Sequence, residues 1–515
     1  MVNRRELLRT GGLLAAISGT SARPGSASPL RVGPEIYQSI GVKPVINCKG
    51  TFTILSGSQS LPEVKAAMDA ASRHYVHMDE LMDAVGKRLA EITQADWGIV
   101  TSGCAAALAH ATAACIAGAD PEKLQRLPDL TGMKNEVIAP RYSRNVYDHA
   151  VRMVGVRMVE VSTIEEYRRA FNDRTAMVMV LAGSGDQGPL GTEALSKIAK
   201  EKGVPLLVDA AAERLTIPNV HLGRGATMVA YSGGKCFRGP QCAGMLLGRK
   251  DLLQAAWIHS APHHAFGRPM KVGKEEIMGM LAAVEAWVKR DHKAEWKQWE
   301  GWLDQIATRA KRVPGVTTEI LQPRGLSNNS PQLRISWDGA ALGVSGRELE
   351  KRLADGTPRI ILGGSSGTRR AGLSKSSITI MPYMMMPGDD KLAAERIHAE
   401  LASPQKIAAP ASPPPAGNIS GQWDVQVQYT AASSTHSFVL EQGTGGLQGS
   451  HKGQFLSGEV RGYIEGDQVQ IQSSHRYEGT RIDYEFTGTL AGDQMKGSVD
   501  VGEYGKGTWT ARRRV

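Results

Sequence analysis

Cysteine is scarce in this sequence, and its spacing argues against two kinds of stabilised fold. The 515 residues include five cysteines, an odd number, and no two of them form a CxxC pair. A disulfide framework uses an even number of cysteines, and a zinc site uses closely spaced pairs. We therefore predict neither a disulfide framework nor a bound metal. The cysteines are Cys48, Cys104, Cys115, Cys236 and Cys242.

Long apolar segments and runs of basic residues are also absent. The apolar run at 11–17 is far shorter than the ~20 residues of a membrane-spanning helix, and no other stretch is long enough. We therefore predict no stable membrane anchor. The net charge is +10, from 61 Lys and Arg against 51 Asp and Glu, but the basic residues are scattered along the chain. We interpret this charge as solvated surface and expect no nucleic-acid partner.

The most informative stretch joins an acid and a lysine across two predicted strands. The apolar run 204–211 follows a helical segment and predicts a buried parallel strand that ends near Asp209. Lys235 follows a second apolar run, 226–231, and lies in a glycine-rich loop where backbone can approach a ligand closely. Ligands of open α/β sheets bind at the carboxyl ends of strands. We therefore expect Asp209 and Lys235 to face one pocket.

This pair of side chains suits the chemistry of pyridoxal 5'-phosphate (PLP). A lysine amine forms a Schiff base with the cofactor aldehyde, and an aspartate keeps the pyridine nitrogen protonated so that the ring accepts electrons. Alone, Lys235 is more typical of a surface lysine and Asp209 of a helix cap. The two together favour the cofactor, and Ser232, three residues before the lysine, is placed to reach its phosphate.

Two motifs resemble a known enzyme family. They are VDAAAE at 208–213 and SGGKCFRGPQ at 232–241. Both resemble the bacterial selenocysteine synthase family of fold-type I PLP enzymes, most closely its lyase-like branch, which includes D-glucosaminate-6-phosphate ammonia-lyase. The resemblance covers roughly residues 35–400. It implies an α/β fold in which helices wrap a mostly parallel sheet, with a small α/β subdomain, PLP as cofactor, and an active site shared between the subunits of at least a dimer.

Two more segments are expected to hold the cofactor. A predicted strand at 98–101 leads through Ser102, Gly103 and Cys104 into a helix, and a helix N-terminus attracts a phosphate through its free N–H groups and dipole. In fold-type I enzymes the loop at 141–149 usually supplies a ring that stacks on the cofactor. The family pattern has a histidine where this chain has Ser143, so Tyr142 is the candidate for that ring.

Three groups of residues are candidates for binding substrate. Ser56 and Ser58 lie in a polar loop that related enzymes use near the substrate, although an ordinary turn is equally compatible. Arg268 and Lys271 belong to a local cationic cluster that suits a phosphate, although solvated charge is an equal alternative. Arg359 has the bidentate geometry that suits a substrate carboxylate.

The C-terminal region has a different pattern. Seven short segments alternate apolar and polar residues, and Gly466-Asp467 and Gly492-Asp493 mark turns between them. This pattern predicts an antiparallel meander or small barrel, with no catalytic group. The predicted strands are 422–429, 437–441, 458–464, 469–473, 482–490, 495–501 and 507–512.

The first residues are typical of an export signal. Arg4 and Arg5 precede the apolar run 11–17, and small residues follow at 21–27, as in twin-arginine signals. We expect export to the periplasm, with a cytoplasmic location as the alternative. The predicted organisation is a signal segment at 1–30, a catalytic domain at 31–402, a proline-rich linker at 403–417 and an all-β domain at 418–515. The catalytic domain divides into a large part, about 62–274, and a small part, about 275–402, which opens with a long helix at 275–302.

Three functions remain open at this point. The first is a PLP-dependent enzyme that removes an α-proton and carries out β-elimination on an amino acid or amino-sugar acid. The second is a β-replacement on seryl-tRNA, as in selenocysteine synthase, which the predicted export argues against. The third is a non-catalytic exported binding protein with a decayed PLP fold, suggested by Ser143 in place of the family histidine.

Overall fold

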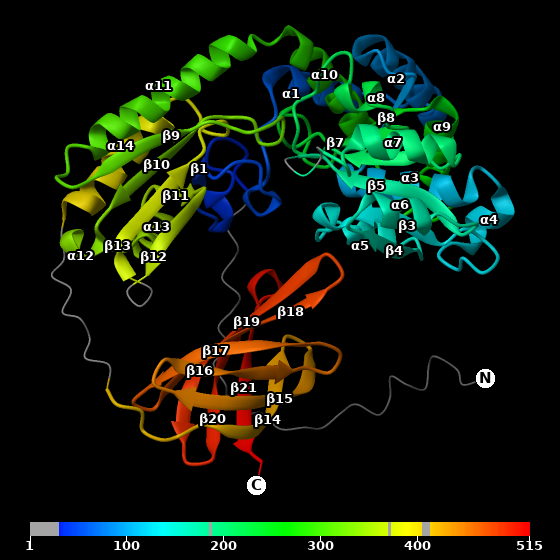
Figure 1. Cartoon of the computed structure of the whole chain (residues 1–515). Coiled ribbons are helices and arrows are strands. Elements are labelled where there is room, and N and C mark those ends of the chain that lie inside the picture. Colours follow the sequence, from blue (N-terminus) through cyan, green and yellow to red (C-terminus); the bar gives the residue numbers. More distant parts are fainter. Residues whose placement is uncertain (1–29, 184, 186–187, 369–371, 404–412, 515) are drawn as a thin grey trace, which may run out of the picture.

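The computed structural model describes residues 30–183, 185, 188–368, 372–403 and 413–514. The predicted signal segment lies outside the described residues except for its last position. Figure 1 shows three parts of the chain: a larger α/β part, a smaller α/β part and a C-terminal barrel. They occur in that order along the sequence, except that the first strand joins the smaller part.

A seven-stranded sheet forms the centre of the larger part. Its order is β2-β8-β7-β6-β5-β3-β4, in which β8 runs antiparallel to both neighbours and the remaining pairs are parallel. Most of its strands are buried along their whole length because helices cover the sheet, which explains their continuous apolar sequences. The strands are β2 (Trp97–Thr101), β3 (Glu136–Pro140), β4 (Arg157–Val161), β5 (Thr175–Leu181), β6 (Leu206–Asp209), β7 (Met228–Ser232) and β8 (Gly244–Gly248).

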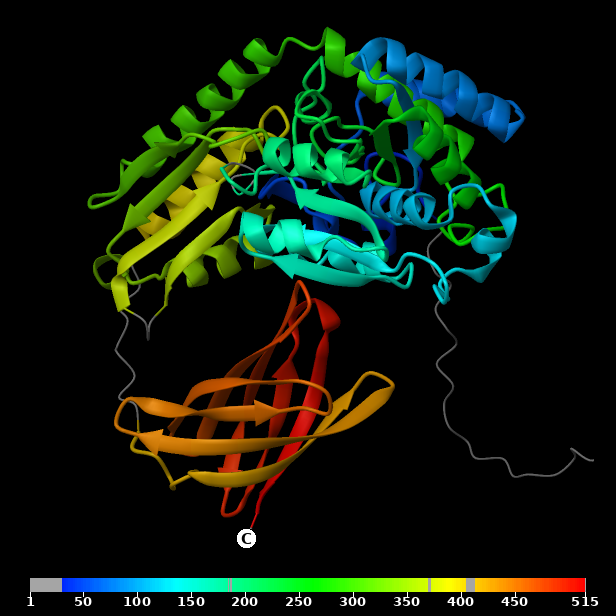
Figure 2. The same ribbon diagram turned by 45° about the vertical axis from the view of Figure 1, so that its right-hand side comes forward.

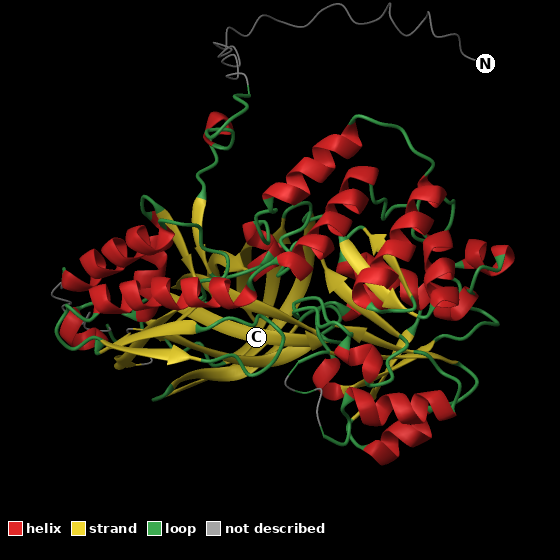
Figure 3. Ribbon diagram, turned by 90° about the horizontal axis from the view of Figure 1, so that it is seen from above, coloured by secondary structure: helices red, strands yellow, loops and turns green. Residues whose placement is uncertain are grey.

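Helices lie on both sides of this sheet, as Figure 3 shows. The alanine-rich helix α3 is almost entirely buried and packs against β2, β5, β7 and β8. The helices of this part are α1 (Pro62–Ser72), α2 (Met78–Thr93), α3 (Cys104–Ala117), α4 (Pro121–Arg126), α5 (Asp148–Arg152), α6 (Ile164–Ala170), α7 (Thr192–Glu201), α8 (Val220–Gly223), α9 (Lys250–His259) and α10 (Lys274–Lys289), with short 3-10 helices η1 (Gln38–Ile40), η2 (Thr53–Leu55) and η3 (Arg141–Ser143).

The smaller part is built on an antiparallel sheet of order β12-β13-β10-β9. Strand β1 (Val45–Cys48), from the N-terminal lead-in, pairs in parallel with β11 (Arg359–Leu362) and so attaches to this part. The other elements are β9 (Thr317–Leu321), β10 (Gln332–Trp337), β12 (Gly364–Thr368), β13 (Gly372–Ile380), α11 (His292–Ala310), α12 (Gly339–Leu342), α13 (Gly346–Asp355) and α14 (Asp389–Ala402).

The long helix predicted at 275–302 is wrong: the structure has two helices there. Helix α10 ends at Lys289, Arg290 is extended, and α11 begins at His292. The Asp291 carboxylate accepts hydrogen bonds from the backbone N–H groups of the second and third residues of α11. An aspartate that caps a new helix competes with continuation of the old one, and this ends the first helix.

The C-terminal strands form a closed antiparallel barrel, in which β21 pairs with β14. The alternating pattern is therefore confirmed, and Trp423, Phe438, Phe486 and Trp509 fill the interior. The prediction missed β16, which is short of apolar residues. The elements are β14 (Gly421–Tyr429), β15 (Ala432–Gly443), β16 (Gly446–Lys452), β17 (Ser457–Glu465), β18 (Gln468–Tyr477), β19 (Thr480–Ala491), β20 (Gln494–Asp500), η4 (Gly502–Tyr504) and β21 (Lys506–Arg513).

The described residues contain neither a membrane-spanning helix nor a cluster of metal ligands. None of their helices combines the length and apolar character that crossing a bilayer requires. In the same ranges, no three or more His, Cys, Asp and Glu side chains are placed to hold a metal ion.

Candidate active site

Asp209 and Lys235 lie at the carboxyl ends of two neighbouring parallel strands. Asp209 is the last residue of β6 and the register partner of Ala230 in β7, and Lys235 follows the end of β7 after two glycines. The positive charge of Lys235 is close enough to act on the Asp209 carboxylate. The structure therefore brings the acid and the amine to the same edge of the sheet, because parallel neighbours end at one edge.

The Asp209 carboxyl is in an environment that disfavours its charge. Asp209 is only 2% exposed, and this burial raises the pKa of its carboxyl. The N–H of Ala211, which donates to Oδ1 at 3.1 Å, and the charge of Lys235 offset this only in part. The Cys104 thiol lies 3.7 Å from Oδ1, and burial raises the pKa of that thiol, so it donates as a neutral group. A buried acid of this kind is suited to a cationic ligand atom.

The loop that carries Lys235 packs closely against residues 56–60. The N–H of Ser58 donates to the carbonyl oxygen of Gly234 at 3.0 Å. Gly57 has φ +65°, and a Cβ atom there would lie 2.6 Å from the same carbonyl oxygen, so only glycine fits. With its amide nitrogen turned toward them, Gln241 donates to the carbonyls of Gly234 and Ser56. Among the described residues, the buried Ser58 hydroxyl has no hydrogen-bond partner. The structure therefore places Ser56 and Ser58 beside the lysine loop.

The N-terminus of α3 lies beside open space at the same edge of the sheet. Gly103 has φ +91°, and a Cβ atom there would meet nothing within 4 Å. The Ser102 hydroxyl donates to the carbonyl oxygen of Met270 at 2.9 Å, which brings the segment of Arg268 and Lys271 to this helix end. The side chains of Arg268 and Lys271 are exposed. Ser232 ends β7 at this edge.

The loop after β3 carries two tyrosines, Tyr142 and Tyr147, whose side chains have different surroundings. The Tyr142 hydroxyl donates to the Leu190 carbonyl at 2.8 Å, and its ring lies against Gly185. Ser143, at the position of the family histidine, is buried and accepts a hydrogen bond from the N–H of Leu181. The ring that approaches Lys235 is Tyr147, with its centre 6.0 Å from Nζ and 47% of the residue exposed.

The sequence prediction selected Tyr142 and not Tyr147, although Tyr147 lies in the same loop. The expectation that a ring comes from residues 141–149 applies to it as well as to Tyr142. Tyr147 precedes α5, and its N–H donates to the Asn145 side chain at 2.7 Å.

Arg359 is in a different setting from the other candidates. It is the first residue of β11, in the smaller part, and its Nε donates to the Ala354 carbonyl in α13 at 3.0 Å. This contact fastens the end of the helix to the strand.

The residues at this edge of the sheet fit a phosphorylated pyridine. The open N-terminus of α3 suits its phosphate, the buried Asp209 suits a protonated ring nitrogen, and the Lys235 amine suits its aldehyde. Among the described residues the Ser58 hydroxyl is buried without a partner, and it lies in the loop that packs against the lysine loop.

Comparison with known proteins also supports a PLP-dependent enzyme. Residues 64–267 match the family model described as aminotransferase class-V. The chain is 30% identical over 375 residues to D-glucosaminate-6-phosphate ammonia lyase of Salmonella typhimurium (strain 14028s / SGSC 2262), across 71% of this chain and 97% of the relative. A solved structure of D-glucosaminate-6-phosphate ammonia-lyase superposes with a TM-score of 0.63 at 29% identity, across 72% of this chain and 99% of that one.

Two other relatives differ in their reactions. The chain is 30% identical over 374 residues to a Streptomyces 5'-C-glycyluridine monooxygenase-decarboxylase, across 70% of this chain and 90% of the relative. It is 25% identical over 286 residues to the L-seryl-tRNA(Sec) selenium transferase of Proteus mirabilis, across 48% of this chain and 57% of the relative.

These similarities confirm the predicted fold class, the predicted cofactor and the prediction of an enzyme. The similarity to the selenium transferase is weaker than the similarity to the ammonia lyase, both in identity and in coverage. These similarities to enzymes argue against the hypothesis of a non-catalytic protein.

Proposed function

This chain belongs to the D-glucosaminate-6-phosphate ammonia lyase family of PLP-dependent enzymes, and on that premise we propose that it releases ammonia from a 2-amino acid by β-elimination. The observation that carries the proposal is the buried Asp209 beside the amine of Lys235, at the carboxyl edge of the sheet. An acid and an amine so placed are what α-proton chemistry on this cofactor requires.

Each residue at the site has a proposed task. PLP, when bound, supplies a sink for the electron pair left on the substrate α-carbon. Asp209 holds the proton on the pyridine nitrogen, and the α3 N-terminus with Ser102, Gly103, Cys104 and Ser232 holds the phosphate. The Lys235 amine takes the α-proton of the substrate and returns a proton later.

The reaction defines the class of substrate. Elimination needs a leaving group on the carbon next to the α-carbon, and in sugar acids this group is a hydroxyl. A 2-amino-3-hydroxy acid loses water and then regains it as ammonia departs, so the net products are ammonia and a 3-deoxy-2-keto acid. Arg268 and Lys271, exposed beside the Ser102 contact, are suited to an anionic group of this substrate. Ser56 and Ser58 are suited to its hydroxyls, and the guanidinium of Arg359 is suited to its carboxylate.

A second activity has a specific observation in its favour. The monooxygenase-decarboxylase relative is as similar in identity as the ammonia lyase. Both chemistries start at the α-carbon of an amino acid, so the same lysine and aspartate serve either. A β-replacement on seryl-tRNA is the third candidate and has the weaker likeness behind it.

A substrate screen on the PLP-loaded protein separates these activities. The panel contains 2-amino-3-hydroxy acids and amino-sugar acids, each with and without a terminal phosphate. Release of ammonia with an equal amount of 2-keto acid supports the lyase. Uptake of dioxygen with release of carbon dioxide would favour the second activity, and a gel shift with seryl-tRNA would favour the third.

We also propose that the enzyme is at least a dimer. Two large apolar side chains in the segment just before Ser56 are exposed, Ile54 at 88% and Phe52 at 51%. A partner subunit over this surface would cover them and close the site.

Export through the twin-arginine pathway is the proposed route to the periplasm. Its support is the sequence pattern of Arg4, Arg5 and the apolar run 11–17. Fractionation of cells that express the full chain tests it, with Arg4 and Arg5 changed to Lys as the matched control. Retention of the wild type in the cytoplasm would contradict the proposal.

A further inference from the structure

The hairpin of β18 and β19 extends from the barrel to the larger α/β part. Figures 1 and 2 show it reaching that part from both angles. Its turn consists of Glu478 and Gly479, between Tyr477 and Thr480. The surface that it meets is the loop after β3 together with α5, which is the segment that carries Tyr147.

The first contact is an ion pair that continues into the loop. The Glu478 carboxylate pairs with the Arg144 guanidinium, which also donates through Nε to Asp148 at 2.5 Å. The Arg144 side chain is 9% exposed and that of Glu478 is 34% exposed, so the arginine end of the pair is withdrawn from solvent. Asp148 is the first residue of α5 and follows Tyr147 directly. These ion pairs therefore connect the turn of the hairpin to the residue that follows Tyr147.

The second contact is between backbones. A Cβ atom at Gly479 would lie 2.1 Å from the carbonyl oxygen of Asn145 and 2.5 Å from its nitrogen, so no side chain fits there. The Asn145 side chain accepts the hydrogen bond from the N–H of Tyr147. The Arg152 guanidinium lies 5.1 Å from the centre of the Tyr477 ring, which adds a cation–π contact at the end of α5.

The turn itself is unusual for a hairpin. Glu478 has φ +53°, a left-handed conformation that two-residue hairpin turns normally give to Gly, Asn or Asp. A side chain with a Cβ atom is strained in that conformation, whereas glycine is not. The ion pair with Arg144 explains why a long acidic side chain stands at this position.

From these contacts we propose that the β18–β19 hairpin is part of the active site, because it positions the loop that holds Tyr147 over Lys235. Glu478 and Gly479 are then positioning residues, not catalytic ones. The inference rests on the proposed function only for the identity of the bound cofactor. It gives the barrel a task in catalysis that its own sequence pattern does not reveal.

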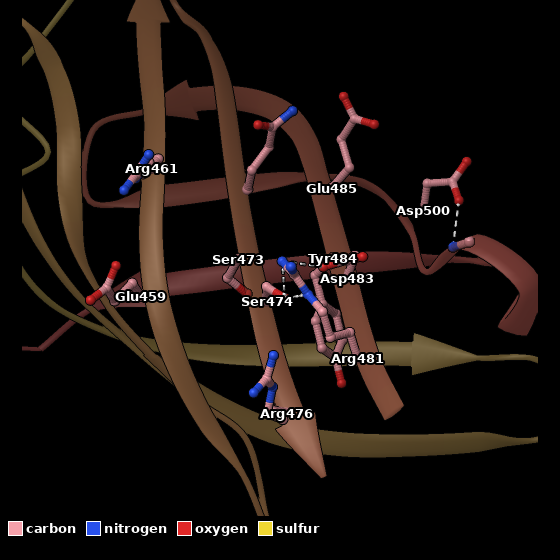
Figure 4. Close-up of a pocket in the computed structure, with 12 residues that line it drawn as sticks. Glu459, Arg461, Ser473, Ser474, Arg476, Arg481, Asp483, Tyr484, Glu485 and Asp500 are labelled. Atoms are coloured by element: carbon pink, nitrogen blue, oxygen red, sulfur yellow. Dashed lines mark hydrogen bonds and ion pairs between the residues drawn. The ribbon is translucent and has the colours of Figure 1, made fainter. Parts of the chain in front are cut away.

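The decisive variant is Gly479→Ala in the full chain. Its Cβ atom would push the hairpin away from Asn145, and φ at this position is not left-handed, so the barrel itself is not strained. The matched control is Gly445→Ala in the β15–β16 turn, where a Cβ atom meets nothing within 4 Å. Glu478→Gln removes the ion pair, and Glu459→Gln, in a groove of about 980 Å³ on the barrel's outer face (Figure 4), is its control.

We expect Gly479→Ala to lower kcat about 10-fold with a smaller change in KM, because a displacement of about 1 Å at a reacting centre lowers rates strongly. The circular dichroism band of bound PLP should change with it, while the control variants keep the wild-type rate and band. If Gly479→Ala behaves like Gly445→Ala in both measurements, the positioning proposal is overturned.

The two proposals fail in different ways. A wild type that binds PLP but turns over no substrate of the panel refutes the proposed function, and the circular dichroism comparison still decides the positioning role. A double-mutant cycle of Arg144→Ala and Glu478→Gln on heat unfolding adds a readout without cofactor. Additive effects would show that the two side chains do not interact and would also overturn the proposal.

Discussion

The Lys235 amine and the Tyr147 ring lie 6.0 Å apart, although 88 positions of sequence separate them. The lysine comes from the glycine-rich loop after β7, and the tyrosine comes from the loop after β3. The carboxyl ends of parallel strands share one edge of the sheet, and this brings the two loops together. This proximity makes Tyr147 the candidate for the ring that stacks on the cofactor.

Replacing the lysine tests the chemistry most directly. Lys235→Ala should lower turnover at least about 1000-fold, because both the cofactor attachment and the proton carrier are lost. The visible absorbance of the bound cofactor should disappear with the activity. The control is Lys289→Ala, an exposed lysine paired with Glu285 on α10, which should keep both. A Lys235→Ala protein that retained the visible band would refute the lysine assignment.

Replacing the aspartate should separate activity from stability. Asp209→Asn keeps the shape but removes the charge, so turnover should fall about 100-fold or more while PLP still binds. Burial raises the pKa of this carboxyl, so its charge destabilises the cofactor-free fold above the raised pKa, and stability is gained as the pH falls through it. The cofactor-free variant should therefore melt at a higher temperature than wild type at pH 8. An unchanged or lower melting temperature would contradict this account of the site.

The two tyrosines of the loop after β3 should respond differently to substitution. Tyr147→Ala should weaken PLP binding about 10-fold through loss of a stacking ring, whereas Tyr147→Phe should bind normally. Tyr142→Phe loses the hydrogen bond to Leu190, which is worth about 1 kcal/mol of stability, and should leave PLP affinity unchanged. Equilibrium titration with PLP measures all three. Weaker binding by Tyr142→Phe, with normal binding by Tyr147→Ala, would reverse the assignment.

Most of the fold could be predicted from apolar runs and turn residues in the sequence. The buried strands of the central sheet are short and continuous in sequence, and the barrel strands alternate, so both patterns were visible. Strand β16 was not, because Gly446–Lys452 combines glycine, polar and charged residues and has few apolar ones. The parallel pairing of β1 with β11 joins segments 314 residues apart, and no local pattern encodes it.

The site was predictable to the extent that it is local. Asp209 ends β6, Lys235 follows the end of β7, and both lie in short motifs, so one sequence stretch contains both. The position of Tyr147 depends on Asn145 and Arg144, and through them on a hairpin 334 residues further along the chain. Such a contact depends on side chains that meet only after both parts have folded.

The exposed apolar surface beside the lysine loop gives a prediction about assembly. Ile54→Asp should convert the dimer into a monomer, because it places a charge in the proposed interface, and activity should fall with it. Light scattering after gel filtration measures the mass. Val439→Asp, on the outer surface of the barrel, is the control and should leave the mass unchanged. A wild type that is monomeric at all concentrations would contradict the prediction.

Three buried histidines inside the barrel give a prediction about pH. His436 Nδ1 and His451 Nε2 are hydrogen-bonded at 2.7 Å, His451 also bonds Ser473, and the His475 ring lies 4.4 Å from that of His451. Burial, with the neighbouring imidazoles, lowers the pKa of His436 to about 4 and that of His451 to about 2, and burial lowers that of His475. All three are therefore neutral in the folded barrel at pH 7.

The direction of the pH effect follows from these lowered pKa values. The unfolded chain binds protons at its histidines below about pH 6.5, whereas the folded barrel does not. Stability should therefore be constant above that pH and fall toward pH 4, by up to about 1.4 kcal/mol per pH unit for each histidine. Urea unfolding between pH 8 and pH 4.5 measures how the free energy of unfolding depends on pH. This dependence should be shallower in His475→Phe than in wild type. The control His74→Gln, at an exposed histidine, should match wild type. Equal slopes in His475→Phe and wild type would mean that the buried imidazole of His475 takes up its proton without unfolding.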